Sequence, residues 1–309
     1  MRIKTIVAGA LGLLLASAAV VVAAPADAAA TATYTAWTWN VAGWKIHRGS
    51  ATDGLIDVIG DSIRNRSANF AALNELCWSQ YKAVQANLRN SGWPQDVENF
   101  SRFEPHRSDG CGGEAFGLAI FSKAPLGPAG RYTLSSDGKP EARKLLCATL
   151  EKGPRVRFCT THITPSNDVI NGKKINETEL AEVRQRLESF EADGDTVLIA
   201  GDFNSQPNYG RLNDWYAPSL NVANNDQNTG AYRELDDTDG RCPGYGEGST
   251  ADNTDGLCGQ SKKIDLIFAR ENRIQGSYEG DSLAISSKCG KACSDHNIVI
   301  GTVTVRANS

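Results

Sequence analysis

The sequence of 309 residues predicts a mixed α/β protein built from packed β-sheets. Predicted strands outnumber predicted helices, and the helices do not alternate strictly with strands as they do around a parallel Rossmann sheet. Apolar residues make up 40% of the chain and charged residues 22%, which excludes a disordered, collagen-like or coiled-coil protein. Because no internal repeat or linker interrupts the chain, we expect a single domain from residue 31 to residue 309.

The first thirty residues have the organisation of a secretory signal peptide. A short basic segment with Arg2 and Lys4 precedes an apolar run over residues 6–22, and Ala26-Asp27-Ala28 fits the small-residue cleavage rule. A membrane anchor is the alternative, because the run is about long enough to span a bilayer. We expect residues 1–28 to be removed and the protein to be secreted, extracellular and free of a membrane anchor.

In the first half of the mature chain, alternating Tyr, Trp and Thr side chains predict a strand at residues 33–40. Apolar residues on one helical face predict a helix that starts at Thr52 and Asp53 and extends to Ile63. A short apolar strand at residues 70–73 precedes a second helix around residues 81–88, which ends at Asn90-Ser91-Gly92. A further apolar strand is expected at residues 116–121.

In the second half, residues 145–150 and 156–161 are predicted to pair as a hairpin around Gly153. A helix over residues 177–190 carries apolar side chains at a period of 3.6 residues, with Asn176 as its expected cap. Between this helix and the C-terminus, residues 224–259 form a long loop rich in Gly and Asp, which is typical of a functional or mobile segment. The remaining predicted strands cover residues 196–200, 263–269 and 298–305.

Eight cysteines lie in the mature chain, and export to an oxidising compartment favours four disulfides. Sequence alone allows 105 connectivities. Folding the hairpin around Gly153 places Cys147 opposite Cys159, close enough for a bridge across the two strands. Pairing Cys242 with Cys258 and Cys289 with Cys293 would close two short loops. Cys77 and Cys111 then remain as the fourth pair.

Polar side chains recur at the carboxyl ends of the apolar strands. A single such residue is usually a solvated cap, but six positions on several strands predict a shared site. Carboxylate and amide oxygens suit a hard divalent cation such as Mg²⁺, and histidines beside carboxylates suit proton transfer. The residues are Asn40, Glu75, His162, Asp202 with Asn204, Asp265, and Asp295 with His296.

Six motifs in this order resemble the endonuclease/exonuclease/phosphatase superfamily, of which deoxyribonuclease I is a secreted member. The combination of Gly-Asp-Phe-Asn with a terminal Ser-Asp-His is specific, and the resemblance extends from Asn40 to His296. It implies a four-layer α/β sandwich, with two packed mixed β-sheets flanked by helices and the site at one edge. It also implies Mg²⁺-dependent cleavage of a phosphoester. The motifs are Thr38-Trp39-Asn40, Leu73-Asn74-Glu75, Thr161-His162, Gly201-Asp202-Phe203-Asn204, Ile264-Asp265-Leu266-Ile267 and Ser294-Asp295-His296.

The resemblance further implies a role for each residue. Glu75 is the expected principal metal ligand. His296, paired with Asp265, is expected to handle the attacking water or hold the phosphate, and His162 to lie at the leaving oxygen. Asn74 departs from the family, in which Gln more often precedes the metal-binding Glu. The other implied roles are metal and phosphate contacts for Asn40, Asp202, Asn204 and Asp295, a phosphate contact for Arg143, and a carboxylate partner of His162 in Glu114.

These expectations define a function class. A net charge of −4 argues against binding nucleic acid by bulk positive charge, but it leaves room for a local basic groove. We expect a secreted phosphodiesterase that uses Mg²⁺, with Mn²⁺ as the alternative metal, and that acts as an extracellular nuclease on DNA without a stable protein partner. The alternatives are a sphingomyelinase-type phospholipase C, a small-molecule phosphatase and an inactive binding module. The chain has no run of adjacent Trp and Phe with which to enter a bilayer, and a dead site would have no chemical reason to keep every motif.

Three weaker features complete the sequence. Residues 237–240 and 252–256 resemble fragments of calcium loops without the full spacing, so a structural Ca²⁺ is the alternative to a solvated acidic loop. Cys289 and Cys293 beside His296 suggest zinc, although no second Cys/His pair completes four ligands. His47 and His106 lie outside every motif and are expected at the surface.

Overall fold

The computed structural model describes residue 1, residues 30–251 and residues 255–308. The predicted signal peptide, residues 1–28, therefore lies outside the described residues apart from Met1. In the described part of the chain, the secondary structure consists of two six-stranded sheets, one two-stranded hairpin, three α-helices and short 3₁₀ turns. Within the same residues, no helix is both long enough and apolar enough to cross a bilayer.

The first sheet has the strand order β13-β14-β1-β2-β4-β3. Strand β1 pairs in parallel with β2 and antiparallel with β14, so the sheet is mixed. Its strands are β1 (Ala30–Asn40), β2 (Phe70–Cys77), β3 (Ser101–Cys111), β4 (Glu114–Ser122), β13 (Ile274–Leu283) and β14 (Ile298–Ala307).

The second sheet has the order β11-β12-β10-β7-β6-β5 and is mixed in the same way. Strand β10 pairs in parallel with β7 and antiparallel with β12. Its strands are β5 (Leu126–Thr133), β6 (Lys144–Leu150), β7 (Val156–His162), β10 (Thr196–Asp202), β11 (Tyr232–Glu234) and β12 (Asp265–Arg270). The separate hairpin consists of β8 (Val169–Ile170) and β9 (Lys173–Lys174).

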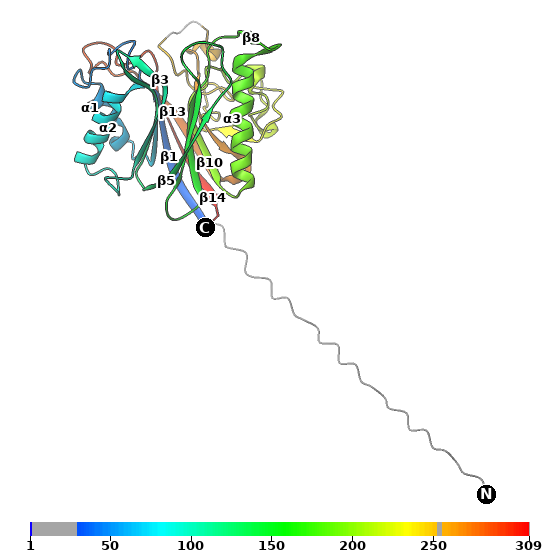
Figure 1. Ribbon diagram of the computed structural model, residues 1–309. Helices are drawn as coiled ribbons and strands as arrows, with labels where there is room; N and C mark the ends of the chain where they lie inside the picture. The colour runs from blue at the N-terminus through cyan, green and yellow to red at the C-terminus, as the bar shows by residue number, and fades with distance from the viewer. Residues whose placement is uncertain (2–29, 252–254, 309) are drawn as a thin grey trace.

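The two sheets pack face to face with helices on their outer faces. Figure 1 shows α1 (Leu55–Asn65) and α2 (Trp78–Asn90) on one side of the sheets and α3 (Ile175–Ala192) on the other. The central core includes Ala36 and Phe70 from the first sheet and Phe158 from the second, and two further cores lie beneath the helices. Burial of these apolar faces is the main stabilising contribution, and the resulting layers confirm the four-layer α/β sandwich.

The structure adds strands that the sequence did not predict. Strands β3, β5, β11 and β13 are the four edge strands of the two sheets. Edge strands carry charged side chains, prolines and bulges that discourage pairing with other molecules. They therefore lack the alternation of apolar residues from which strands are recognised. The predicted cap of α3 is also wrong, because Lys174 occupies that position and Asn176 is buried inside the helix, where it donates to Asn167 Oδ1.

All four predicted disulfides are present, and no free cysteine occurs among the described residues. The register of the β6–β7 hairpin pairs Cys147 directly with Cys159, which confirms the cross-strand argument. The zinc alternative is wrong because Cys289 and Cys293 are bonded to each other. The other two bridges are Cys77–Cys111 and Cys242–Cys258.

Candidate active site

The predicted site residues lie where the strands of both sheets end. Along a strand, alternate side chains share a face, and Asn40 shares its face with Tyr34 and Ala36 of the core between the sheets. The same alternation places His162, Asp202 and Asp265 on the inner faces of β7, β10 and β12. On each of these faces they lie next to the residues of the apolar core. The strands thus deliver polar side chains from both sheets to one edge of the sandwich.

Asp202 lies at the centre of this group. Its Oδ2 accepts a hydrogen bond of 3.0 Å from Asn40 Nδ2, which joins the two sheets. The same oxygen lies 3.5 Å from His162 Nε2 and 3.9 Å from His296 Nε2. Burial, together with the nearby charge of Asp265, raises the pKa of Asp202 to about 7.

Glu75 reaches the site from a distorted part of β2. The pairing of β2 with β4 shifts between Leu73 and Leu76, and Glu75 adopts a φ of +57° there. This left-handed conformation costs a residue with a side chain about 1–2 kcal/mol, and such strain concentrates at functional sites. The turn brings Glu75 Oε1 within 3.0 Å of Asn40 Nδ2, so Asn40 bridges Glu75 and Asp202.

The acidic groups around Glu75 repel one another, and a divalent cation would relieve this repulsion. Burial raises the pKa of Glu75, and the charges of Glu141 and Asp295 raise it further, against the lowering effects of Asn40 and His296. Asp295 is more exposed and pairs with Lys45 at 2.6 Å, which holds its pKa low despite partial burial. Mutually repelling carboxylate oxygens beside a cavity are the donor set that Mg²⁺ prefers, so these residues fit a hard divalent cation.

The Asn40 amide links the two carboxylates at the centre of the site. Its Oδ1 accepts from the backbone N–H of Ala42, while its NH₂ group donates to Glu75 and Asp202. In this arrangement Asn40 holds the two carboxylates together, and its Oδ1 keeps a second lone pair with which it can contact a cation. Glu75 and Asp295 are the stronger candidates for metal ligands, because their side chains are carboxylates.

His296 is held by a buried carboxylate. Its Nδ1 lies 2.8 Å from Asp265 Oδ2, and Ser249 Oγ donates to the same oxygen at 2.8 Å. Burial alone would lower the pKa of His296, but the charges of Asp265, Asp202 and Asp295 outweigh it and raise the pKa to about 10. His296 is therefore an imidazolium at neutral pH, suited to an anionic phosphate oxygen.

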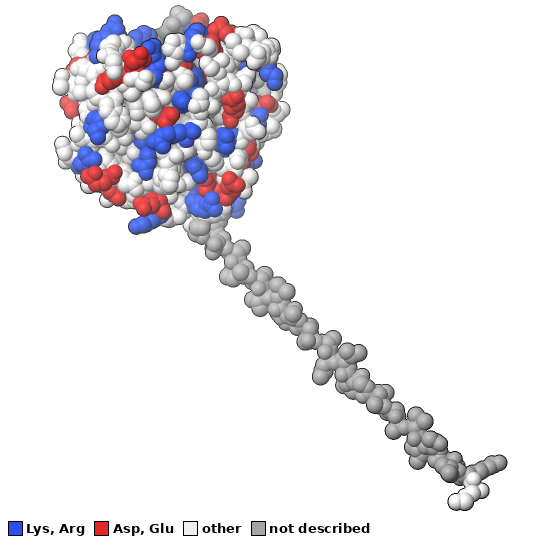
Figure 2. Space-filling model, viewed as in Figure 1, with Lys and Arg blue, Asp and Glu red and all other residues white. Residues whose placement is uncertain are grey.

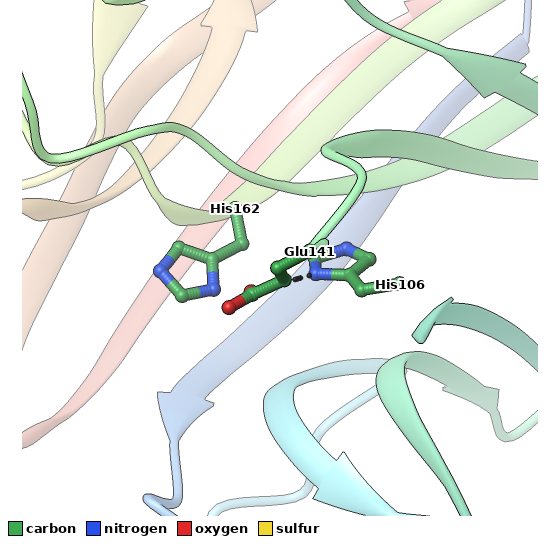
Figure 3. Close-up of side chains that lie close together, drawn as sticks. All are labelled: His106, Glu141 and His162. Carbon is green, nitrogen blue, oxygen red and sulfur yellow. Dashed lines mark hydrogen bonds and ion pairs between the residues drawn. The ribbon is translucent and has the colours of Figure 1, made fainter. Parts of the chain in front are cut away.

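His162 has the opposite protonation state. It is almost fully buried, and this burial, with the nearby positive charges of Arg143 and His296, holds its pKa well below 6.5. Its Nδ1 has no hydrogen-bond partner among the described residues. In Figure 3 this nitrogen faces the carboxylate of Glu141, on whose other side lies His106. Glu141 accepts hydrogen bonds from His106 Nδ1 and from Arg143.

The predicted pairing of Glu114 with His162 is corrected by this arrangement. Glu114 accepts from the backbone N–H and hydroxyl of Ser79, in the first turn of α2. A carboxylate at a helix N-terminus satisfies N–H groups that lack partners within the helix, so Glu114 is a capping residue. The carboxylate beside His162 belongs to Glu141, which lies in the loop before β6, where no sequence motif marked it.

Two asparagines organise the backbone around the site. Asn204 donates from its side chain to Ile163 O at 2.8 Å and from its backbone to Asp202 Oδ1, which ties the loops after β7 and β10 together. Asn74 donates to Thr161 O and accepts from the backbone N–H of Asp202, so it joins β2 to the opposite sheet. Asn204 was predicted at the site, whereas Asn74 was noted only as a departure from a family pattern.

Several other predicted features fall differently from expectation. Arg143 lies at the site but is paired with Glu141 at 2.7 Å. His47 and His106 are buried, not exposed, and His47 is hydrogen-bonded at both nitrogens, to Asp53 and to Cys293 O. Ser249, Glu141 and His106 were missed because each comes from a loop or edge strand and carries no local signal.

The acidic loop brings ligand atoms of Asp236, Asp239 and Glu247 within 4.8 Å of one another, but ion pairs with Lys263 and Arg241 already engage these carboxylates. The carboxylate of Asp237 accepts from Arg233 and from the Tyr278 hydroxyl. Asp236 is paired with the buried Lys263 at 2.6 Å. These protein cations already neutralise the carboxylates, and residues 252–254 of the second fragment lie outside the described residues.

The sequence matches the model of the Endonuclease/Exonuclease/phosphatase family over residues 37–296. No curated protein sequence matches significantly. Similar folds occur among solved structures. The human Nocturnin catalytic domain with bound sulfate anion is 15% identical, with a TM-score of 0.64, over 88% of this chain and 93% of that chain.

Two other solved structures share the fold. An endonuclease/exonuclease/phosphatase family protein from Bacteroides thetaiotaomicron is 14% identical, with a TM-score of 0.61, over 89% of this chain and 98% of that chain. TDP2 from D. rerio, complexed with a single strand DNA product, is 16% identical, with a TM-score of 0.58, over 88% of this chain and 98% of that chain. Identities this low establish a common fold and nothing finer.

Proposed function

Because the chain belongs to the endonuclease/exonuclease/phosphatase family, whose members hydrolyse phosphoester bonds, we propose that it is a divalent-metal-dependent phosphodiesterase that cleaves nucleic acid, with DNA as its main substrate. One observation carries this proposal. Asp202 Oδ2 accepts a hydrogen bond from Asn40, whose NH₂ group also donates to Glu75. The same Asp202 oxygen lies close to both His162 Nε2 and His296 Nε2. Metal-binding oxygens, a neutral imidazole and an imidazolium therefore meet within reach of one phosphate group.

Each side chain has a role that follows from its charge. Glu75 and Asp295 would hold the cation, which supplies neutralisation of phosphate charge and stabilisation of the leaving oxygen. The imidazolium of His296 binds a non-bridging phosphate oxygen, and Asp265 keeps it protonated and oriented. In place of the leaving-oxygen role that the family resemblance implies, the neutral Nε2 of His162 accepts a proton from the attacking water, because it lies beside Asp202 and carries no proton to donate. Asp202 and Asn204 position the water and the loops around it.

The surroundings of the site support a polyanionic substrate. A cavity of about 210 Å³ beside Glu75 and Glu141 is lined by the cations Lys45 and Arg107 and by the aromatic Trp44. On the face in Figure 2, Lys and Arg side chains are mixed with Asp and Glu and gather in small groups. Local basic groups of this kind bind phosphates even when the whole protein is acidic. The solved TDP2 structure with a single strand DNA product shows that the fold accommodates such a ligand in that protein.

A phospholipid phosphodiesterase is the second candidate, favoured by one surface feature. The hairpin of β8 and β9 projects from the molecule beside α3 (Figure 1). Its first strand exposes Val169 at 64% and Ile170 at 37%, and its second strand carries Lys173 and Lys174. Exposed aliphatic and basic side chains suit the surface of an anionic bilayer. The hairpin has no aromatic residue, so DNA remains the favoured substrate.

Export is part of the same proposal. The four disulfides support export, because disulfides form and persist in an oxidising compartment. The sequence of residues 1–28 supports removal of a signal peptide. N-terminal sequencing of protein secreted into culture medium tests this: a mature start near residue 29 supports export, and retention of the protein inside the cell contradicts it.

The substrate is tested with purified mature protein on three substrates: plasmid DNA, sphingomyelin vesicles and a phosphomonoester. Each is incubated with Mg²⁺, with EDTA, and with the His162→Ala variant. We expect plasmid cleavage that requires both Mg²⁺ and His162. Release of phosphocholine from vesicles with intact plasmid would move the protein to the phospholipid branch, and Val169→Ser/Ile170→Ser should then abolish it. Cleavage of the phosphomonoester alone would make the protein a phosphatase.

A further inference from the structure

The cluster of His106, Glu141 and His162 is chemically distinct from the oxygen-rich group around Glu75. One ligand atom from each of the three lies within 4.8 Å of the other two. They come from three places in the chain, since His106 lies on the edge strand β3, Glu141 on the loop before β6 and His162 at the end of β7. Figure 3 shows the carboxylate of Glu141 between the two imidazoles.

The ring nitrogens of this cluster are incompletely satisfied. His106 and His162 are each only 4% exposed. Nδ1 of His162 has no hydrogen-bond partner among the described residues, whereas Nδ1 of His106 is bonded to Glu141 and its unpartnered Nε2 lies on the far side of the ring. A buried polar atom without a partner costs about 1–3 kcal/mol and indicates either a functional group or a missing ion. The unpartnered Nδ1 of His162 faces Glu141, toward the middle of the cluster.

We propose that His106, Glu141 and His162 form a second metal site, which binds a borderline divalent cation such as Zn²⁺ and thereby blocks the neighbouring phosphodiesterase site. Two imidazoles and one carboxylate are a donor set that Zn²⁺ takes in catalytic and regulatory sites. Nitrogen donors favour Zn²⁺ strongly over Mg²⁺, which prefers oxygen. Zn²⁺ should therefore bind the histidine cluster, and Mg²⁺ the oxygen-rich group around Glu75.

The surroundings of the cluster allow a cation to enter and be coordinated. Glu141 lines the same cavity as Glu75, so the cavity gives access to the carboxylate of the cluster, whereas the two histidines lie behind it. Ligand atoms at about 2.0–2.2 Å from Zn²⁺ lie closer together than 4.8 Å, so binding draws the three side chains inward. Burial lowers the pKa of His106 and of His162, and both are therefore neutral, as metal ligation requires.

Occupation of this cluster has a defined chemical consequence. When Nδ1 of His162 binds a cation, the ring proton resides on Nε2. That nitrogen lies 3.5 Å from Asp202 Oδ2 and is the proton acceptor of the proposed reaction. A protonated Nε2 cannot accept a proton, so the cation inhibits without displacing Mg²⁺ from Glu75. This inhibition rests on the proposed function, whereas the binding of Zn²⁺ does not.

Isothermal titration with Zn²⁺ in excess Mg²⁺ tests the site on the wild type and on His106→Gln, Glu141→Gln and Glu75→Gln. We expect one Zn²⁺ per wild-type molecule, retention of that binding in Glu75→Gln, and at least a ~10-fold loss of affinity in His106→Gln and Glu141→Gln. Circular dichroism identifies a variant that fails to fold. In that case, Co²⁺ added to wild-type protein should show the visible absorption of a four-coordinate nitrogen-containing site.

Three results would overturn the proposal: no Zn²⁺ binding by the wild type, binding unchanged in both cluster variants, or binding lost in Glu75→Gln. The last would place the ion in the oxygen-rich site. An enzyme that binds Zn²⁺ as expected but cleaves no phosphodiester would contradict the proposed function and leave the metal site intact. An active enzyme that binds no Zn²⁺ would contradict the metal site and leave the proposed function intact.

Discussion

The side-chain oxygen of Asn74 accepts a hydrogen bond of 2.8 Å from the backbone N–H of Asp202. Asn74 ends the parallel pairing of β1 with β2 in one sheet, whereas Asp202 ends β10 in the other. The NH₂ group of the same side chain donates to Thr161 O at 3.2 Å, next to His162. A single buried amide thus fixes the positions of Asp202 and of the backbone next to His162 relative to Glu75, which follows Asn74 in the chain.

Replacement of Asn74 should therefore affect both stability and turnover. In Asn74→Ala the N–H of Asp202 and the carbonyl of Thr161 lose a buried partner, which we expect to lower the free energy of unfolding by about 1–3 kcal/mol. Turnover should fall even where the protein remains folded, because Asp202 is no longer held. Urea unfolding and plasmid cleavage measure the two effects. Full activity in a destabilised variant would show that Asn74 has only a structural role.

The protonation of His296 depends on Asp265. In the metal-free protein we expect the imidazole to titrate near pH 10, and Asp265→Asn to lower that pKa, because it removes the strongest of the neighbouring charges that raise it. The folded pKa lies above the unfolded value of about 6.5, so this group's contribution to stability is complete below pH 6.5 and is lost as the pH rises toward 10.

Nuclear magnetic resonance of the histidine side chains measures both states. His162 serves as the internal control, because it should remain neutral down to well below pH 6.5. A His296 pKa near 6.5 in the wild type, or no decrease in Asp265→Asn, would contradict the assignment of an imidazolium at this position.

Metal affinity should depend mainly on Glu75. Glu75→Gln removes a carboxylate whose raised pKa reflects burial and crowding by other acids, and we expect Mn²⁺ affinity to fall by at least about 10-fold. Asp295→Asn should have a smaller effect, because Asp295 is already paired with Lys45. Titration calorimetry with Mn²⁺ gives both values. Equal affinities for the wild type and Glu75→Gln would place the cation elsewhere.

Lys263 pairs with two buried acids, neither of which the proposed chemistry uses. Its side chain is fully buried and lies 2.6 Å from Asp236 Oδ2 and 3.3 Å from Glu234 Oε2. Lys263→Met leaves both carboxylates without this cation, and we expect a loss of about 3–5 kcal/mol in unfolding free energy. The neighbouring Lys262 is one-third exposed and pairs with Asp255, so Lys262→Met should cost less than about 1 kcal/mol. Equal effects in urea unfolding would refute the role of burial.

The central parts of the fold were predictable because they carry strong periodic signals. Strands β1, β2, β7, β10 and β12 are buried on one or both faces, and their apolar runs end at the polar residues of the site. The edge strands were not predictable, since solvent exposure and charged side chains remove that signal. Strand β3 (Ser101–Cys111), for example, contains Pro105 and four charged residues, which are Arg102, Glu104, Arg107 and Asp109.

The same distinction explains which site residues could be found. Asp202 and His296 sit in motifs at strand boundaries, whereas Glu141 lies in a loop whose position is decided by tertiary packing. Spacing along the chain favoured Glu114 for the role, but that residue caps α2. His106 reaches the site only through the pairing of β3 with β4, and nothing in its sequence neighbourhood indicates burial.

We expect Glu75, and not Glu114, to belong to a metal-dependent phosphodiesterase site. The most direct test is the rate of plasmid cleavage in Mg²⁺ by the wild type, Glu75→Gln and Glu114→Gln, with folding checked by circular dichroism. We expect Glu75→Gln to lose at least about 100-fold in rate and Glu114→Gln to stay within about threefold of the wild type. A fully active Glu75→Gln variant, or an inactive but folded Glu114→Gln variant, would contradict the account.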